Sequence, residues 1–466
     1  MSFPKTILLC VAVATTMAGT ATDLELTMVH NHPFVVAPAT IKLVISGGNI
    51  TPGTVNGYVL HYTDGADTYS DTSSTSVDYL YPFGGELSHP FTVGPGETKY
   101  FTIWVEAVGD PNPANDTIHY ALHGLTFLPD KVVLVEEGQG TWCNWCPRGY
   151  VVLDSMDERY GDTIATVGIH WSASSIEPMA FDEYAWWMVS TGRFSGIPGA
   201  TIDRTHNKVP TNYYDDRIDE QKVLPPPASV SVSSSVNWTT SEIEIDIEVE
   251  MAAELTGDYR VNAIVVEHGV TGPSPDYDQR NSYAGGANGP MGIYSSLPDP
   301  VPAGQMVYDR VARALGGGPE GDSASLPPFL GVNSSHTYQY IVSLESVGNS
   351  HNVEVIAILL DGTTGEVLNA GKGSLNTGID LTIGPQIRLF PNPARDLAFV
   401  DVYLVRPATV SMTVFDMAGK VVDDRTYGTL NGQQLLPIRT EAYPSGLYVA
   451  SLRVGDVVQA LRLAVE

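Results

Sequence analysis

Hydrophobic and polar residues alternate with a period of two along much of the chain, and this pattern predicts β-strands. In the segment EIEIDIEV (242–249), acidic residues alternate with isoleucine and valine, as expected for a strand with one face in water. Short runs rich in β-branched and aromatic residues, separated by Gly, Pro, Asn and Asp, occupy residues 22–127 and recur in 225–380. We therefore predict β-structure on both sides of a central region that has a different hydrophobic pattern.

That central region, residues 128–224, is predicted to alternate strands with helices. Residues 132–135 are β-formers, whereas Leu153, Met156 and Tyr160 have the i, i+3, i+7 spacing of one helix face. Alternation of this kind is typical of an α/β layer. Further strands are expected at 163–171 and within 195–204, and further helices at 178–194 and 211–224.

The predicted fold is therefore multidomain and mainly β, with immunoglobulin-like β-sandwiches flanking one α/β domain. The sandwiches are assigned to residues 22–127 and 225–380, and the proline run 225–227 forms a stiff boundary. Within the second sandwich, residues 271–330 are rich in Gly, Pro, Ser and Asn and are expected to form long loops. Another small β unit is expected from residue 385 to the end. A chain of 466 residues is long enough for three or four such domains.

The chain is strongly acidic, with 53 Asp and Glu against 24 Lys and Arg, a formal net charge of −29. Such a surface repels nucleic acid and anionic lipid, so we expect neither as a partner. A soluble, self-repelling exported surface explains this acidity. Calcium binding in the Asp-rich segment 64–78 remains an alternative, although the segment lacks EF-hand spacing.

The first 21 residues have the pattern of a cleaved secretory signal. One Lys precedes an apolar run at 7–13, and small residues lie near Ala21, where cleavage is expected. This run is too short to span a bilayer, and no later run is long enough, so the mature chain is predicted to have no transmembrane span. Cys10 follows Leu9, where a lipoprotein signal has a small residue, so lipid attachment there is not expected.

Removal of Cys10 leaves two cysteines, Cys143 and Cys146, in the mature chain. A disulfide across two residues closes almost no loop, so this pair is better explained by redox chemistry than by stabilisation. Pro147 favours a helix start at this point, where unpaired N–H groups stabilise a thiolate. An inert pair or a zinc site are the alternatives, although zinc would have only two thiols. Phosphate-loop, dinucleotide and Ser-His-Asp motifs are absent from the sequence, so no cofactor is expected.

The motif TWCNWCP is followed, about 50 residues later, by a proline (Ile197–Pro198). Together with the order of strands and helices, these features resemble a thioredoxin fold over residues 128–224. Together with the sandwich at 225–380, these residues are similar to the thioredoxin-like outer-membrane protein family of Bacteroidota. The resemblance implies that Pro198 is cis and lies beside the cysteines. It also implies that Glu137 is a buried carboxylate that manages the proton of Cys146. In this interpretation Cys143 is the nucleophile, Cys146 resolves the mixed disulfide, and the partners are protein or peptide thiols and disulfides.

Three segments near the C-terminus resemble a type-A C-terminal sorting domain, assigned to 385–466. They are FPNPARD (390–396), VFDMAGKVV (414–422) and YPSGLYVASL (443–452). The resemblance implies recognition by the type IX secretion machinery and a secreted or cell-surface location, reached through the periplasm.

Two functional hypotheses follow. The first is an exported thioredoxin-fold protein that exchanges disulfides through Cys143 and Cys146. The second is a non-catalytic surface or adhesion protein that uses the same fold as a recognition scaffold. The Asn144–Trp145 spacer leaves the direction of exchange open. For His170, at the end of a predicted strand, packing or hydrogen bonding is expected rather than catalysis.

Overall fold

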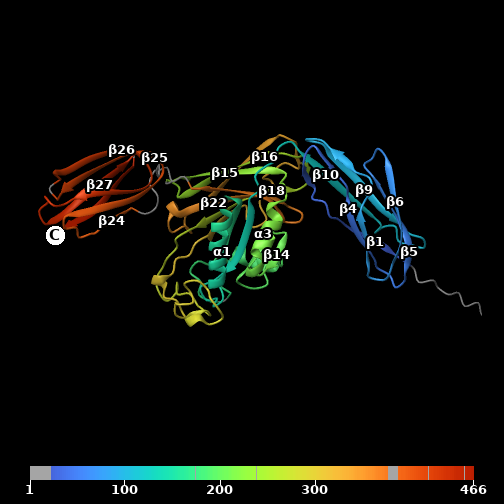
Figure 1. Cartoon of the computed structure of the whole chain (residues 1–466), viewed down its shortest axis with the longest axis horizontal. Helices are drawn as coiled ribbons and strands as arrows, with labels where there is room; N and C mark the ends of the chain where they lie inside the picture. The colour runs from blue at the N-terminus through green and yellow to red at the C-terminus, as the bar shows by residue number, and fades with distance from the viewer. Residues whose placement is uncertain (1–21, 174, 238, 376–386, 418, 456) are drawn as a thin grey trace, which may run out of the picture.

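The computed structural model describes residues 22–466 except 174, 238, 376–386, 418 and 456. The predicted signal peptide (1–21, with Cys10) and the predicted boundary between 380 and 385 lie outside the described residues. Strands make up most of the regular structure and are arranged in several sheets (Figure 1). The prediction of a mainly β chain built from several sheets is confirmed.

The N-terminal strands form two main sheets that share one core. One sheet has the order β1-β4-β7, the other β2-β10-β9-β5-β6, and β3 pairs with β8. Leu24 and Ile45 of the first sheet pack in the same cluster as Leu60, Phe101 and Ile103 of the second, as in a β-sandwich. The strands are β1 (Leu24–Val29), β2 (Phe34–Val36), β3 (Ala39–Ile41), β4 (Val44–Asn49), β5 (Val55–Thr63), β6 (Thr68–Val77), β7 (Pro82–Glu86), β8 (Phe91–Val93), β9 (Thr98–Glu106) and β10 (Thr117–Leu125).

An eight-stranded mixed sheet occupies the middle of the chain, in the order β14-β13-β11-β12-β19-β18-β22-β23. β11 and β12 are parallel, β13 is antiparallel to β11, and β12 meets β19 in parallel at Gly168 and Val311. The sheet therefore combines four strands from residues 128–224 with four from residues 225–380. The strands are β11 (Val133–Gln139), β12 (Ile164–His170), β13 (Gly199–Ile202), β14 (His206–Val209), β18 (Tyr259–Glu267), β19 (Val311–Gly316), β22 (Val353–Asp361) and β23 (Val367–Ser374).

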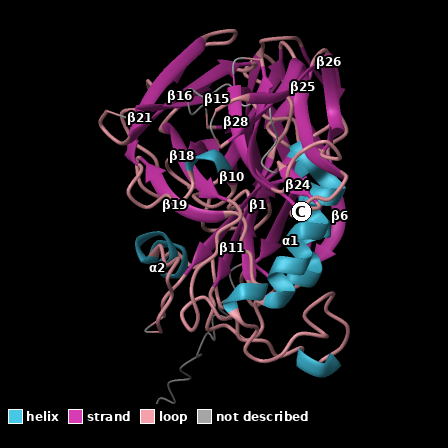
Figure 2. Cartoon of the chain, turned by 90° about the vertical axis from the view of Figure 1, so that its left-hand side faces the viewer, coloured by secondary structure: helices cyan, strands magenta, loops and turns pink. Residues whose placement is uncertain are grey.

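Three α-helices cover this sheet: α1 (Pro147–Tyr160), α2 (Asp182–Ser190) and α3 (Tyr214–Lys222). Val133 and Val135 of β11 pack with α1 and α3, whereas Leu134 between them packs with α2. Because side chains alternate across a strand, α1 and α3 lie on one face and α2 on the other. Figure 2 shows α1 and α2 on either side of β11. The same alternation sends Glu136 and Glu137 to opposite faces.

A second sheet, β15-β16-β21, packs against the half of the large sheet that contains β18 and β22. Ile243, Ile245 and Ile247 of β16, the apolar residues of the alternating segment, lie in this core. Between β18 and β19, residues 268–310 contain only short 3₁₀ turns; we call them the capping loop. The additional strands are β15 (Ala228–Asn237), β16 (Glu242–Met251), β17 (Leu255–Thr256), β20 (Phe329–Leu330) and β21 (Ser335–Ser343).

The C-terminal strands form a separate sheet system with its own core, in the order β24-β25-β27-β28, and β26 pairs with β25. Asn392, from the segment FPNPARD, donates to Arg462 O (2.8 Å) and accepts from Ala464 N (2.8 Å), so this motif is fastened to the last strand. The strands are β24 (Arg388–Phe390), β25 (Leu397–Asp416), β26 (Val421–Arg439), β27 (Gly446–Val454) and β28 (Val457–Val465). Among the described residues, no helix is long and apolar enough to cross a membrane.

Candidate functional site

Cys143 and Cys146 form a disulfide immediately before helix α1. Their Cα atoms lie 5.4 Å apart, and the helix begins at Pro147, the next residue. Cys143 has 4% of its surface exposed and Cys146 has 0%. The pair therefore lies at the helix N-terminus that the sequence predicts, and Cys143 is the more accessible of two well-buried sulfurs.

Pro198 approaches the disulfide from the segment that leads into β13. The Ile197–Pro198 peptide bond is cis, and Ile197 O lies 3.7 Å from Cys143 Sγ. A groove of about 190 Å³ borders this segment, lined by residues 194–199 on one side and Lys208, Val209 and Pro210 on the other. The structure thus brings Cys143 and the Ile197–Pro198 bond together, as the resemblance implies.

Glu137 is completely buried near the end of β11. Its carboxylate accepts hydrogen bonds from the Tyr214 hydroxyl (2.6 Å) and the Gln139 amide (3.0 Å). A side chain at Gly149, in the first turn of α1, would collide with this carboxylate, so the two are in direct contact. Burial raises the pKa of Glu137 to about 7. The two hydrogen bonds and the positive charges of Arg310 and Arg148 oppose that rise.

The capping loop covers the cysteine turn. Gln279, which is fully buried, donates to Cys143 O (2.9 Å), and its own amide oxygen accepts from the Tyr150 hydroxyl (2.9 Å). Arg280 N donates to Thr141 O and Ser282 N to Asn144 O, at 2.9 and 2.8 Å. The sequence predicts loops in this region, but it gives no sign that they contact the cysteines.

Aromatic side chains surround the turn, and they include Trp142 and Trp145 of the motif itself. Trp145 is 41% exposed and meets Tyr283 of the capping loop edge to face, with ring centroids 5.7 Å apart. Trp142 Nε1 donates to Trp171 O (2.6 Å), and Trp171 packs edge to face on Trp186, which is 54% exposed. Trp145 and Trp186 therefore offer apolar surface to solvent near the disulfide.

His170 is buried and hydrogen-bonded, as predicted, but its partner Glu177 was not predicted. His170 Nδ1 lies 3.0 Å from Glu177 Oε1, and Glu177 Oε2 accepts from Thr141 N at 2.5 Å. Burial alone would raise the pKa of Glu177, but the His170 contact and the Thr141 hydrogen bonds hold it below its usual range. The carboxylate thus ties the end of β12 to the turn that carries Cys143.

On the opposite face of β11, Glu136 forms a buried ion pair that the sequence analysis also missed. Arg204 Nη2 lies 2.7 Å from Glu136 Oε1, both side chains have no exposed surface, and the Tyr184 hydroxyl donates to the same carboxylate. Arg204 follows β13, so this pair fixes the strand that carries Pro198 against β11. Removing one partner of a buried pair costs about 3–5 kcal/mol.

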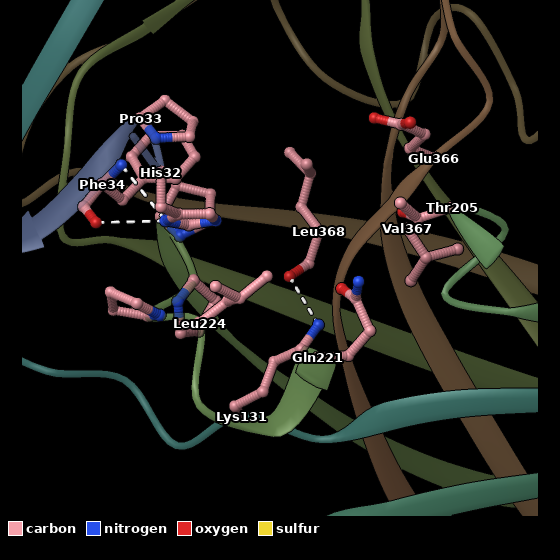
Figure 3. Close-up of a pocket in the computed structure, with 13 residues that line it drawn as sticks. His32, Pro33, Phe34, Lys131, Thr205, Gln221, Leu224, Glu366, Val367 and Leu368 are labelled. Atoms are coloured by element: carbon pink, nitrogen blue, oxygen red, sulfur yellow. Dashed lines mark hydrogen bonds between the residues drawn. The ribbon is translucent and has the colours of Figure 1, made fainter. Parts of the chain in front are cut away.

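A second cavity of about 190 Å³ lies where the N-terminal sandwich meets the central body. It is lined by His32, Pro33 and Phe34, by Leu224 and the prolines 225–227, and by residues 366–368 (Figure 3). Lys131 crosses it, donating to Leu368 O (3.0 Å) and pairing with the buried Asp203 (2.7 Å). None of the predicted site residues lines this cavity, and we assign it no chemistry.

Residues 388–466 match the family described as a secretion system C-terminal sorting domain. This match covers the three segments identified from the sequence and confirms the predicted sorting domain. The domain marks the chain for type IX secretion, with a secreted or cell-surface location. No curated protein matches the sequence.

Solved structures resemble this chain only remotely. The red sea bream transglutaminase is 10% identical over 58% of this chain and 36% of its own, with a TM-score of 0.18. The native α2-macroglobulin of Escherichia coli is 10% identical over 96% of this chain and 32% of its own, with a TM-score of 0.21. The BSP domain of a biofilm-associated protein is 8% identical over 96% and 81%, with a TM-score of 0.16. The chain spans about a third of the length of the first two, and scores this low carry no argument about fold or function.

Proposed function

We propose that the exported chain exchanges disulfides with protein or peptide thiols through Cys143 and Cys146, on a thioredoxin-like α/β scaffold. One arrangement supports this proposal: a disulfide directly before α1, the Ile197–Pro198 bond facing Cys143, and Glu137 under the first turn of the helix. The free N–H groups of a helix N-terminus stabilise a thiolate, and the nearby carboxyl group provides a site for a proton. Thiol–disulfide exchange proceeds through the thiolate form of cysteine, so both features favour it.

In the proposed reaction, a substrate thiolate attacks Cys143 Sγ, the less buried sulfur, and forms a mixed disulfide. The Cys143–Cys146 bond breaks, and Cys146 leaves as a thiolate that takes up the proton held by Glu137. A second substrate thiolate then displaces Cys143, so the substrate is oxidised to a disulfide and the pair is reduced. With a substrate disulfide and a reduced pair, the same steps run in reverse.

The surface next to Cys143 suits an extended peptide. The groove at residues 194–199 borders the Ile197–Pro198 bond, and the exposed parts of Trp145 and Trp186 supply apolar area. The cysteines are nevertheless covered, so a protein substrate requires the capping loop to move away from the cysteine turn. Gln279 is one of the residues that hold the loop there.

The decisive experiment traps the mixed disulfide. In the Cys146→Ser variant, Cys143 has no resolving partner, so the mixed disulfides that its thiolate forms with disulfide-containing substrates should accumulate on non-reducing gels. Cys143→Ser is the matched control, since it removes the nucleophile and should form none. The proposal is wrong if reduced wild-type protein shows no exchange with a model disulfide protein and Cys146→Ser traps nothing.

Burial of both sulfurs favours a second candidate, in which the disulfide is inert and the domain is a recognition scaffold. The reduction potential separates the two. Structural disulfides of exported proteins have potentials below about −300 mV, whereas exchanging pairs lie above that value. A potential of the Cys143/Cys146 pair below this limit, together with the absence of trapped complexes, would favour the scaffold.

A further inference from the structure

Three carboxylates meet at one end of the N-terminal sandwich. Asp23 directly precedes β1, Asp110 lies within the β9–β10 connection, and Asp116 is the last residue of that connection. One oxygen from each carboxylate lies within 4.8 Å of the others. Three oxygens bound to one Ca²⁺ at about 2.3–2.6 Å can be at most about 5 Å apart, so this spacing accommodates a shared ion.

Asp116 provides an independent sign that a ligand belongs here. Its side chain is only 7% exposed, yet Oδ1 is buried without a hydrogen-bond partner. Buried polar atoms almost always have partners, and a buried carboxylate without one is costly. The side-chain oxygen of its neighbour Asn115 is also buried and without a partner.

The other two carboxylates are held in place by hydrogen bonds. Leu24 N donates to Asp110 Oδ2 at 2.8 Å, and Asn115 Nδ2 donates to Asp23 Oδ1 at 3.0 Å. Among the ion pairs of the described residues, none includes Asp23, Asp110 or Asp116. Burial, followed by the negative charges of Asp110 and Asp23, raises the pKa of Asp116 to about 6. Among the described residues, the three carboxylates therefore have no cationic side chain as an ion-pair partner.

We propose that Asp23, Asp110 and Asp116 bind one Ca²⁺ ion at this end of the N-terminal sandwich. A set of ligands made only of oxygen atoms suits Ca²⁺ better than Zn²⁺, which prefers nitrogen and sulfur. Extracellular modules bind Ca²⁺ with dissociation constants of about 10⁻⁴–10⁻³ M, and this chain is exported. The ion fastens the start of β1 to the β9–β10 connection.

Other aspartates of the same domain lack these features. Asp64, in the Asp-rich segment 64–78, accepts backbone hydrogen bonds and lies 3.6 Å from Lys99 Nζ. Asp71 accepts from Ser88 N (2.7 Å) and the Tyr62 hydroxyl (3.1 Å). Their carboxylates already have partners, so neither is included in the proposed site.

The test is thermal unfolding and calorimetric titration of the full chain with CaCl₂ after treatment with EDTA. One Ca²⁺ per chain should bind with the affinity above. The unfolding midpoint of the N-terminal domain should rise by about 5 °C at a tenfold excess over the dissociation constant, because the ion binds only the folded state. Asp116→Asn should bind at least tenfold more weakly, which reduces this rise to about 2 °C or less at the same Ca²⁺ concentration. Without Ca²⁺ it should be no less stable than wild type, because it removes repulsion.

Asp67→Asn is the matched control, because it removes one charge from an exposed position of the same domain. It should bind Ca²⁺ as wild type does. Asp110→Asn provides a second variant in case Asp116→Asn fails to fold. The proposal is overturned if wild type shows no Ca²⁺-dependent rise, or if the rise persists unchanged in both Asp116→Asn and Asp110→Asn.

Discussion

Glu137 combines complete burial with hydrogen bonds that stabilise its charged form. Tyr214 and Gln139 both donate to the carboxylate, yet burial outweighs them and raises the pKa to about 7. Near neutral pH the group is therefore divided between its protonated and ionised forms. A carboxyl group of this kind can accept or supply a proton in the pH range where thiols exchange.

The raised pKa of Glu137 predicts how the stability of the protein depends on pH. Unfolding returns Glu137 to its usual pKa of about 4.5, so its contribution to stability is fully present below pH 4.5. That contribution is lost as the pH rises towards and through 7, because the unfolded state ionises first. Glu137→Gln cannot ionise, so wild type should lose on the order of 3 kcal/mol relative to this variant between pH 4.5 and 8.

The measurement is the pH dependence of the unfolding midpoint of the central domain for both proteins, by calorimetry. Comparing the slopes of the two curves cancels the contributions of the other carboxyl groups that titrate in this range. Glu177→Gln serves as a contrasting variant, since the pKa of Glu177 is lowered rather than raised. Parallel curves for wild type and Glu137→Gln would show that Glu137 does not have a raised pKa.

The candidate site is only partly predictable at the residue scale. Cys143, Cys146 and Glu137 lie in one short stretch, and Pro198 is marked by its glycine-flanked segment, so local pattern and resemblance identify them. Gln279 lies 136 residues from Cys143, whose carbonyl it contacts. No local pattern distinguishes Gln279 from the other polar residues of the capping loop, so only the tertiary structure shows its role. The same holds for Glu177, whose importance depends on where the turn at Thr141 folds.

At the scale of elements, the capping loop controls access to the disulfide. It replaces solvent over the cysteine turn with Gln279, Tyr283 and backbone groups, although it has no strand or α-helix of its own. An apolar cluster that joins Tyr294 and Tyr308 of the loop to Met179 holds it closed, together with a few buried polar contacts over the cysteine turn. Loss of one such contact, with a carbonyl left unsatisfied, costs about 1–3 kcal/mol.

Gln279→Ala should accordingly open the loop more often and expose Cys143. We expect the disulfide to be reduced about tenfold faster by a small thiol, because about 1.4 kcal/mol changes the open population tenfold. The measurement is the rate of reduction by dithiothreitol, followed by alkylation of the freed thiols and mass spectrometry.

Gln305→Ala is the control for this experiment: the same substitution on the same loop, at an exposed residue. It should react at the wild-type rate. Equal rates for wild type and Gln279→Ala would mean that the loop does not limit access to the disulfide.

The elements were more predictable than their assembly. Hydrophobic spacing identified β11, β12, α1 and the alternating strand β16, because each is encoded locally. The joining of the two halves of the eight-stranded sheet depends on Gly168 and Val311, 143 positions apart. Such a contact leaves no periodic signal in either segment. The change in pattern at the proline run 225–227 therefore gives no indication that one sheet continues across it.

At the scale of the whole molecule, the sorting domain is a unit of its own. Its hydrophobic cluster contains only residues from Ala394 to Val465, and no residue of the other clusters. We therefore expect the other domains to fold without the sorting domain, which directs export and does not stabilise them.

Deleting residues 385–466 should separate folding from export. In a bacterium with a type IX system, the truncated chain should accumulate in the periplasm, whereas the full chain reaches the surface or the medium. The Cys143–Cys146 disulfide should still form, and the unfolding midpoint of the central domain should change by less than about 2 °C, because the hydrophobic cluster of the sorting domain shares no residue with the central clusters. Immunoblots of the periplasm, outer membrane and medium measure the distribution. Truncated chain outside the cell would contradict the sorting role, and a misfolded truncated chain would contradict the independence of the two units.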